Sequence, residues 1–508
     1  MRRLDVALAC ALAACLAGCA TSALDMAPPR FDRPWTPATT DRGEWLAGQK
    51  GPAEATGGYV LPADPAAASF PPAPAIDDAR IYSLPELIDL AESSNPATRI
   101  AWNDARRVAL AAGIAESTYL PRLSASAVGA YQSSRANDSV LGIGGDSNQS
   151  GSGVISALSL EWLLFDFGQR TAVIEAARQA SLISNIAFTA AHQQVIYEVS
   201  LAFYAHAAAR TRLATASQSL KNAQAVQAAA EDRYKHGIGT VIEVAQARQA
   251  TAQANLALVQ ATGGIQDAYL RLLTAMGVSP LAKIRVADVS GRKLSPAMAA
   301  SVEGIISESL ARRPDVLSAY AAQKASLAKV QAAEAEFMPK LFVAATGAYN
   351  SGRLNVTALP SVGQQPPTVN INGRRTGVTV FAGVTVPLYD GGTRDAMLAQ
   401  ARADADSAEA RLTRIRQDAV RQIVLADNAL RTSLSAHDAS DALVSAAQTT
   451  FDAALAAYRS GVGSITDLTL AETQLLLARN AHADAYSTAL SAAATLALAA
   501  GALGSAPP

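Results

Sequence analysis

Two short stretches of the sequence carry polar groups at matching spacings. Each has a tyrosine, two glycines three and five residues later, and an acid nine residues later: Tyr234, Gly237, Gly239 and Glu243 in the first, and Tyr458, Gly461, Gly463 and Asp467 in the second. Such an acid can stabilise the positive end of a helix. The chemistry indicated by the residues themselves is therefore local capping.

Both stretches are predicted to be turns between helices. Gly237 and Gly461 stand where one helix ends and can take the left-handed conformation that follows a helix C-terminus. Thr240 and Ser464 are the predicted N-caps of the returning helices. Glu243 and Asp467 follow three residues later, so both turns are expected to carry capping boxes.

No arrangement of residues in the sequence resembles a catalytic site. The five histidines show neither an i,i+4 pair nor the spacing of a metal site. The glycine-rich stretch at Gly142 lies in a polar loop and lacks the strand–helix context of a phosphate-binding loop. The net charge of -1 gives no electrostatic signature for nucleic acid. We expect no enzyme activity, no metal and no nucleic-acid partner.

The N-terminus is predicted to be an export signal. Two arginines precede a short apolar run that ends in Leu16-Ala17-Gly18-Cys19. This ending resembles the lipobox of bacterial lipoproteins, which implies removal of residues 1–18 and covalent lipid on Cys19, the only cofactor expected. By the same resemblance, Ala20 implies delivery to the outer membrane. Residues 19–80 are rich in Pro and Ala and are predicted to be an extended, lipid-anchored linker.

The rest of the chain is a tandem duplication. Pro121 corresponds to Pro339, 218 residues later, and Gly129-Ala130-Tyr131 recurs at the same offset as Gly347-Ala348-Tyr349. Farther along, "LFDFGQR" at Leu164 corresponds to "LYDGGTR" at Leu388, 224 residues later, and the two tyrosine turns share this offset. The repeats are assigned to residues 81–290 and 296–505.

Each repeat contains two segments with alternating apolar and polar residues. They are predicted to be strands at about 122–132, 154–165, 340–350 and 378–389. Their length suits strands that cross a membrane, and the loops within each pair are long and polar. Four strands are too few to close a barrel, so the membrane interpretation requires several copies of the chain.

A very long helix is predicted after each pair of strands, from about Gly168 to Tyr234 and from Gly392 to Tyr458. Each spans roughly 100 Å at 1.5 Å per residue. Alanine-rich helices of this length need neighbours. The returning helices, 240–276 and 464–500, cover half the length, and the helix before the strands is expected to cover the remainder.

These features together resemble the TolC family of outer-membrane efflux channels, over roughly residues 81–505. The predicted lipid on Cys19 is similar to that of the OprM-like members that serve RND-type pumps. The resemblance implies a mainly α-helical fold with membrane strands. Three chains would form a 12-stranded β-barrel continuous with a periplasmic α-helical barrel, and a periplasmic adaptor and an inner-membrane pump would open its tip.

The resemblance also implies roles for the two turns. Tyr458 would contact Glu243, and Asp467 would form a ring of three acids at the pore. Where relatives carry an arginine and a second aspartate, this chain has Gly463 and Leu470, so Leu470 is an alternative, apolar constriction. The expected adaptor contacts are the exposed turn residues: Gly237, Ile238, Gly239, Gly461, Val462 and Gly463.

Two other functions are compatible with the sequence. The chain could be the exit duct of a type I protein-secretion system, although the lipobox is more typical of the efflux group. It could instead be an elongated structural lipoprotein of the envelope, which would form no pore.

Overall fold

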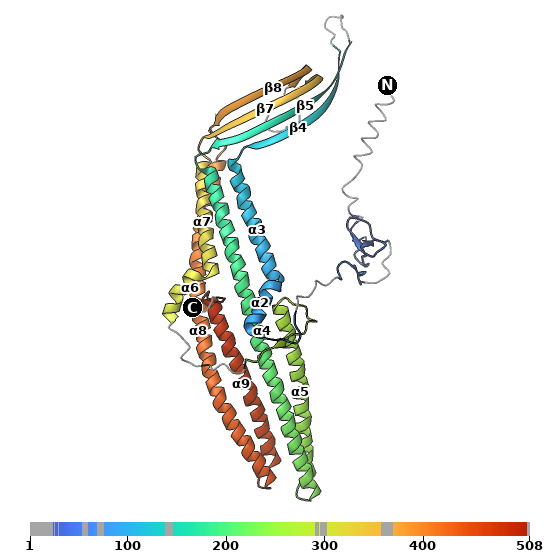
Figure 1. Cartoon of the computed structure of the whole chain (residues 1–508), viewed down its shortest axis with the longest axis vertical. Coiled ribbons are helices and arrows are strands. Elements are labelled where there is room, and N and C mark those ends of the chain that lie inside the picture. Colours follow the sequence, from blue (N-terminus) through green and yellow to red (C-terminus); the bar gives the residue numbers. More distant parts are fainter. Residues whose placement is uncertain are drawn as a thin grey trace. The chain divides into compact units, whose positions relative to one another are not determined.

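In a computed structural model of the chain, helices and strands follow the order expected of a duplicated unit (Figure 1). The structure describes residues 24, 26–28, 30–52, 59–68, 76–137, 146–289, 294, 302–356 and 369–504. The chain divides into two compact units, Met1–Ala75 and Ile76–Pro508. The predicted signal peptide 1–18 and the predicted lipidation residue Cys19 lie outside the described residues.

The N-terminal unit contains local structure within the predicted linker. β1 (Ala38–Thr39) pairs antiparallel with β2 (Trp45–Leu46). The Trp45 backbone N–H donates to Asp64 Oδ2 and its indole N–H donates to the Pro62 carbonyl, both at 3.2 Å. The expectation of an extended segment is thus corrected in part, because these bonds fold residues 45 and 62–64 together.

The second unit contains the two repeats. The first comprises β3 (Ile81–Tyr82), α2 (Leu84–Ser94), α3 (Pro96–Glu116), η2 (Ser117–Tyr119), β4 (Arg122–Asn137), β5 (Asp146–Phe165), α4 (Gln169–Lys235), α5 (Val241–Ala275) and β6 (Arg285–Val286). The second comprises α6 (Val302–Arg312), α7 (Pro314–Ala335), β7 (Lys340–Val356), β8 (Val369–Thr385), α8 (Thr393–Arg459) and α9 (Ile465–Ala499).

The long helices have the predicted length and the predicted neighbours. α4 and α8 each contain 67 residues and start after glycines with positive φ, Gly168 at 93° and Gly392 at 85°. α3 and α5 pack along α4, and α7 and α9 pack along α8 (Figure 1). α4 also contacts α7 and α9, which joins the two repeats. None of the helices in the described ranges has an apolar run sufficient to cross a lipid bilayer.

The four long strands form one antiparallel sheet in the order β4-β5-β7-β8. The registers place most of the apolar positions of the four strands on one face, because strand positions two residues apart lie on the same side of a sheet. This face carries Leu123, Ala125, Ala127, Val154, Leu158, Leu160, Trp162, Val343, Ala345, Val378, Val380, Ala382 and Val384. The opposite face carries a polar row that runs across all four strands, Ser124–Ser159–Thr346–Thr379.

The strand boundaries differ from the prediction. The strands contain 16, 20, 17 and 17 residues, because polar residues assigned to the loops continue the hydrogen-bonded ladder. The pairing uses backbone groups, so polar side chains do not end it. β8 ends at Thr385 rather than at residue 389, since Pro387 has no N–H to donate.

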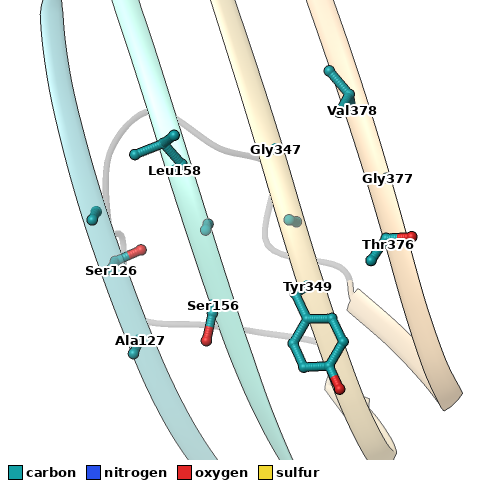
Figure 2. Close-up of a pocket in the computed structure, with 12 residues that line it drawn as sticks. Ser126, Ala127, Ser156, Leu158, Gly347, Tyr349, Thr376, Gly377 and Val378 are labelled. Atoms are coloured by element: carbon teal, nitrogen blue, oxygen red, sulfur yellow. The ribbon is translucent and has the colours of Figure 1, made fainter.

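Small residues leave a hollow of about 820 Å³ in the middle of the sheet (Figure 2). Gly347 and Gly377 lie in its lining beside alanines, and Leu158, Tyr349 and Val378 are the larger side chains there. In the single chain, residues of the four strands alone line this hollow.

Candidate functional site

The ends of the two helical hairpins are turns of the same geometry. Gly237 and Gly461 have φ of +75° and +84°, the left-handed conformation predicted for them. The N–H of Gly237 donates to the Tyr234 carbonyl, and that of Ile238 to the Arg233 carbonyl. Gly461 and Val462 donate in the same way to Tyr458 and Ala457. Both turns are therefore Schellman motifs, which satisfy the last carbonyls of a helix.

The second glycine of each turn is required by close packing. A Cβ on Gly239 would lie 2.9 Å from the Tyr234 backbone nitrogen. A Cβ on Gly463 would lie 2.9 Å from Ala457 Cβ and 3.0 Å from the Tyr458 nitrogen. Any larger residue would push the turn away from the preceding helix.

The predicted N-caps are present, whereas the predicted capping boxes are wrong in one detail. Thr240 Oγ1 accepts the Glu243 N–H at 3.2 Å, and Ser464 Oγ accepts the Asp467 N–H at 3.1 Å. Neither acid bonds back to the backbone N–H of its N-cap within the described residues. Asp467 Oδ2 accepts the Ser464 hydroxyl at 2.7 Å instead, and Glu243 points to the other hairpin.

Tyr458 joins the two hairpins. Its side chain is 1% exposed, and its hydroxyl donates to Glu243 Oε2 at 3.4 Å. Burial raises the pKa of the Tyr458 phenol, and the negative charge of Glu243 raises it further. The structure therefore brings together the tyrosine and the acid that the resemblance paired.

Arg233 completes this contact, and the sequence analysis missed it. Its guanidinium lies over the Tyr458 ring at 5.0 Å, Nη1 donates to the Tyr458 carbonyl at 3.0 Å, and Nη2 donates to the Ile238 carbonyl at 3.4 Å. Its Nε is 3.9 Å from Glu243 Oε2. We call Arg233, Glu243 and Tyr458 the tip cluster.

A comparison of the two repeats contains the signal that would have revealed Arg233. At the offset of 224 residues its counterpart is Ala457, and the counterpart of buried Tyr458 is Tyr234, which is 49% exposed. The repeats thus differ at the positions where one hairpin contacts the other.

Most of the remaining predicted tip residues are exposed in the single chain, whereas Gly239 and Gly463 are half-buried. Ile238 and Val462 are 67% and 84% exposed, and Leu470 is 58% exposed. Asp467 is also exposed, and in the described part of the chain its side chain is bonded to Ser464 alone. Among the described residues, the backbone carbonyl of Ile238 accepts a hydrogen bond from Arg233, whereas the side chain of Asp467 forms no hydrogen bond with the tip cluster.

A buried acid lies in the contact between α4 and α9. Glu472 is 6% exposed, and Ser219 donates its hydroxyl to Glu472 Oε1 at 3.4 Å. Burial raises the pKa of Glu472 to about 7. Its counterpart in the first repeat is Arg248, so the acid is a property of the second repeat alone.

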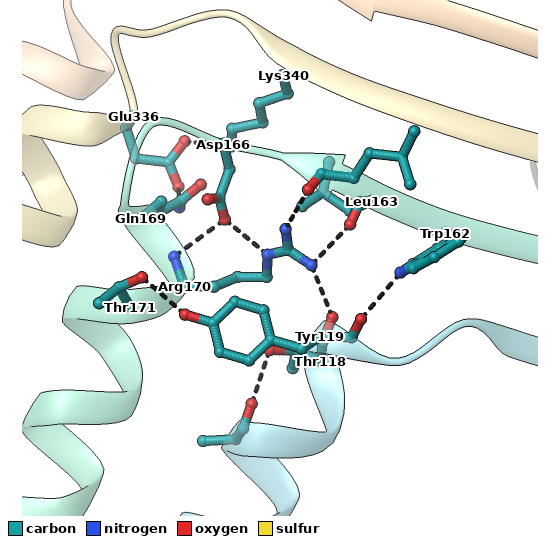
Figure 3. A network of polar contacts seen from close by, with 12 residues as sticks. Thr118, Tyr119, Trp162, Leu163, Asp166, Gln169, Arg170, Thr171, Glu336 and Lys340 are labelled. Atoms are coloured by element: carbon teal, nitrogen blue, oxygen red, sulfur yellow. Dashed lines mark hydrogen bonds and ion pairs between the residues drawn. The ribbon is translucent and has the colours of Figure 1, made fainter.

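A second polar cluster fixes the junction between sheet and helix (Figure 3). The Arg170 guanidinium bonds Asp166 Oδ2 at 2.8 Å and lies over the Tyr119 ring at 4.9 Å. It also donates to three carbonyls, those of Thr118, Leu163 and Leu164. The second repeat has the equivalent pair, with Arg394 Nε 2.8 Å from Asp390 Oδ2. Each arginine anchors the start of a long helix where the chain leaves the sheet.

No group of three or more His, Cys, Asp or Glu side chains suited to a metal ion occurs among the described residues. His437 and His482 stack with ring centroids 4.9 Å apart, and His482 Nδ1 lies 3.3 Å from Asp441 Oδ1. These histidines pack between α8 and α9.

The sequence can be aligned with those of known proteins over most of its length. Protein CyaE of Bordetella pertussis is 29% identical over 81% of this chain and 82% of its own length. The outer membrane protein OprJ of Pseudomonas aeruginosa is 28% identical over 75% of each. The crystal structure of a membrane protein from Pseudomonas aeruginosa has a TM-score of 0.69 and 25% identity, and the match covers 82% of this chain and 93% of that one.

The family model for the outer membrane efflux protein matches residues 87–278 and 305–502, one segment in each repeat. Together the two segments include the sheet, both long helices and both turns. The chain therefore belongs to the outer membrane efflux protein family.

Proposed function

We propose that three copies of the chain form a passive exit duct, which carries drugs or other small toxic molecules from the periplasm to the exterior. The observation that carries this proposal is the sheet, whose apolar face is exposed in the single chain. Val378, Val380 and Val384 are 80%, 66% and 61% exposed. Such a face suits lipid.

The number of strands supports assembly from at least two chains, and three is the number that the family resemblance implies. A closed membrane barrel needs about eight strands or more, and one chain supplies four. Three chains supply twelve strands, and the helices α4 and α8 would continue the barrel as a tunnel across the periplasm. The duct has no energy source of its own, so an inner-membrane pump of the RND type would drive transport.

The hairpin turns are the proposed contact with the periplasmic adaptor. The exposed apolar side chains Ile238 and Val462 stand between glycines that permit close backbone approach. Asp467 from three chains would form an acidic ring at the pore, with Leu470 one helical turn away. The tip cluster would hold the hairpins together until the adaptor binds.

Lipid on Cys19 would anchor the chain to the outer membrane. The lipobox-like sequence before Cys19 supports this. In cells fed radiolabelled palmitate, the chain should take up label and the Cys19→Ser variant should not.

Native mass measurement and planar lipid bilayers test the duct. The purified protein should be a trimer and should give discrete ion-conducting events. A monomer without conductance would overturn the proposal in favour of a structural envelope lipoprotein. Deletion of the gene should raise susceptibility to small toxic compounds; an altered secretome with unchanged susceptibility would indicate protein secretion.

A further inference from the structure

The sheet has two edges that are unpaired in the described part of the chain. β4 pairs only with β5, and β8 pairs only with β7. A free edge exposes a row of N–H and C=O groups, which find no water in lipid. The proposed duct would close these edges between copies. Closure alone does not specify which residue of β8 faces which residue of β4.

The duplication supplies a rule that the two hairpins obey. Residues of β4 correspond to residues of β7 that come 218 later, and residues of β5 to residues of β8 that come 224 later. Ala125 lies opposite Leu158 in the first hairpin. The offsets convert this pair to Val343 opposite Ala382, which is the pair observed in the second hairpin.

The same rule can be applied to the contact between the two repeats. There, Leu158 of β5 lies opposite Gly347 of β7. Adding 224 to the first number gives Ala382 of β8, and subtracting 218 from the second gives Gly129 of β4.

We propose that β8 pairs antiparallel with β4 of a second copy of the chain, with Ala382 opposite the partner's Gly129. The register then continues in both directions: Val384 faces the partner's Ala127, Val380 faces the partner's Tyr131, and Val378 faces the partner's Ser133. This register rests on the proposed function, because it requires that the chain assembles through its sheet edges.

The distribution of side chains is consistent with the register. The rule takes no account of side-chain type, yet it joins the apolar face of β8 to the apolar face of β4. A slip of one residue would move every β4 side chain to the other face. Val380 and Tyr131, which are 66% and 75% exposed in the single chain, would become a β-branched–aromatic pair, a favourable combination across strands.

Paired cysteines test the register in the full chain within its membrane. Directly opposite residues have Cβ atoms about 4.5–5.5 Å apart, close to the separation of a disulfide. The test chain carries Ala382→Cys together with Gly129→Cys. No heavy atom lies within 4 Å of a Cβ added at Gly129, so the cysteine fits there. Mild oxidation should give dimer and trimer bands on denaturing gels, and reduction should remove them.

Three controls make the result specific. Leu158→Cys with Gly347→Cys occupies the corresponding pair inside one chain, so it should oxidise without forming dimers and thereby shows that the sheet is folded. Each single-cysteine variant should give no band, which also controls for Cys19. Ala382→Cys combined with Ala127→Cys or Tyr131→Cys shifts the register by two residues and should cross-link poorly.

The outcomes separate this inference from the proposed function. Efficient cross-linking by a shifted pair, with the matched pair unreactive in a native trimer, would overturn the register and leave the duct intact. A monomeric native mass, with no intermolecular band from any pair, would overturn both.

Discussion

At the scale of residues, the second repeat contributes two unusual groups to the contact between hairpins. Tyr458 is buried against Arg233 and Glu243, and Glu472 is buried against Ser219. Their counterparts, Tyr234 and Arg248, are exposed. Because the chain is duplicated, a substitution in one repeat can be compared with the same substitution at the corresponding position of the other repeat.

Arg233→Ala should weaken the closed tip, because it removes a hydrogen bond to the Tyr458 carbonyl and the guanidinium over the ring. These contacts are worth about 1–2 kcal/mol together, which corresponds to a rise of about 5- to 30-fold in open probability in planar bilayers. Tyr458→Phe loses only the bond to Glu243 and should have a smaller effect. Tyr234→Phe is the control; an equal effect there would contradict a role for the tip cluster.

Glu472 should make the contact between α4 and α9 depend on pH. Its pKa is raised from 4.5 to about 7, so the folded chain holds the proton more tightly than the unfolded chain. The contribution of Glu472 to stability is therefore greatest below about pH 4.5 and is lost as pH rises through 7, by about 3 kcal/mol per chain for a shift of this size.

Melting temperatures at pH 5.5 and pH 8 measure this dependence. Wild type should melt lower at pH 8, and Glu472→Gln should lose most of the difference. The helices that contact α9 carry charged residues that include Lys221 on α4, Asp452 on α8, and Arg248 on α5, which pairs with Glu231. None forms an ion pair with Glu472 in the described residues. Asp452→Asn should keep the wild-type difference, and the same loss in that variant would exclude Glu472 as the source.

At the scale of elements, the sequence was most informative where backbone constraints act locally. Gly237 and Gly461 mark the turns because a left-handed residue must follow each helix, and the fixed offsets reveal the repeats. Strand ends were less predictable, since polar residues such as Asp146–Ser152 continue a backbone ladder. Contacts between distant segments, such as Arg233 with Tyr458, leave no local pattern. The predicted capping box of Glu243 was wrong for the same reason: Tyr458 of the other hairpin binds its carboxylate.

Gly463→Ala should distort the second turn, because the new Cβ would lie 2.9–3.0 Å from Ala457 and the Tyr458 nitrogen. The surrounding backbone cannot yield cheaply, so we expect a loss of about 1–3 kcal/mol. Faster hydrogen exchange at the ends of α8 and α9 would report it. Gly264→Ala in α5 is the control, since its Cβ would meet no heavy atom within 4 Å and alanine favours helix by about 1 kcal/mol. Equal exchange in both variants would show that the turn tolerates a side chain.

At the scale of the whole molecule, the described residues of one chain form neither a pore nor a closed sheet. The single chain presents an exposed apolar face, two open edges, and an acid at its tip whose side chain bonds only Ser464 among the described residues. In the proposed duct, each of these features acquires a role when copies assemble. The charge of Asp467 is therefore best tested in the assembled protein.

Asp467→Asn separates the charge of this residue from its part in the helix cap. Oδ2 of Asp467 accepts the Ser464 hydroxyl at 2.7 Å, and an asparagine oxygen can accept the same bond, so the turn should keep its fold. What disappears is the negative charge, which in a trimer would be present three times around a narrow pore. Three carboxylates attract cations and bind divalent ions, so the variant should show weaker cation selectivity and weaker block by divalent ions in planar bilayers.

Asp452→Asn removes an exposed charge from α8 away from the turn and should leave both properties unchanged. If Asp467→Asn also leaves both unchanged, the constriction does not consist of an acidic ring, and Leu470→Ala becomes the variant expected to raise conductance, because it would widen an apolar constriction at the same end of α9.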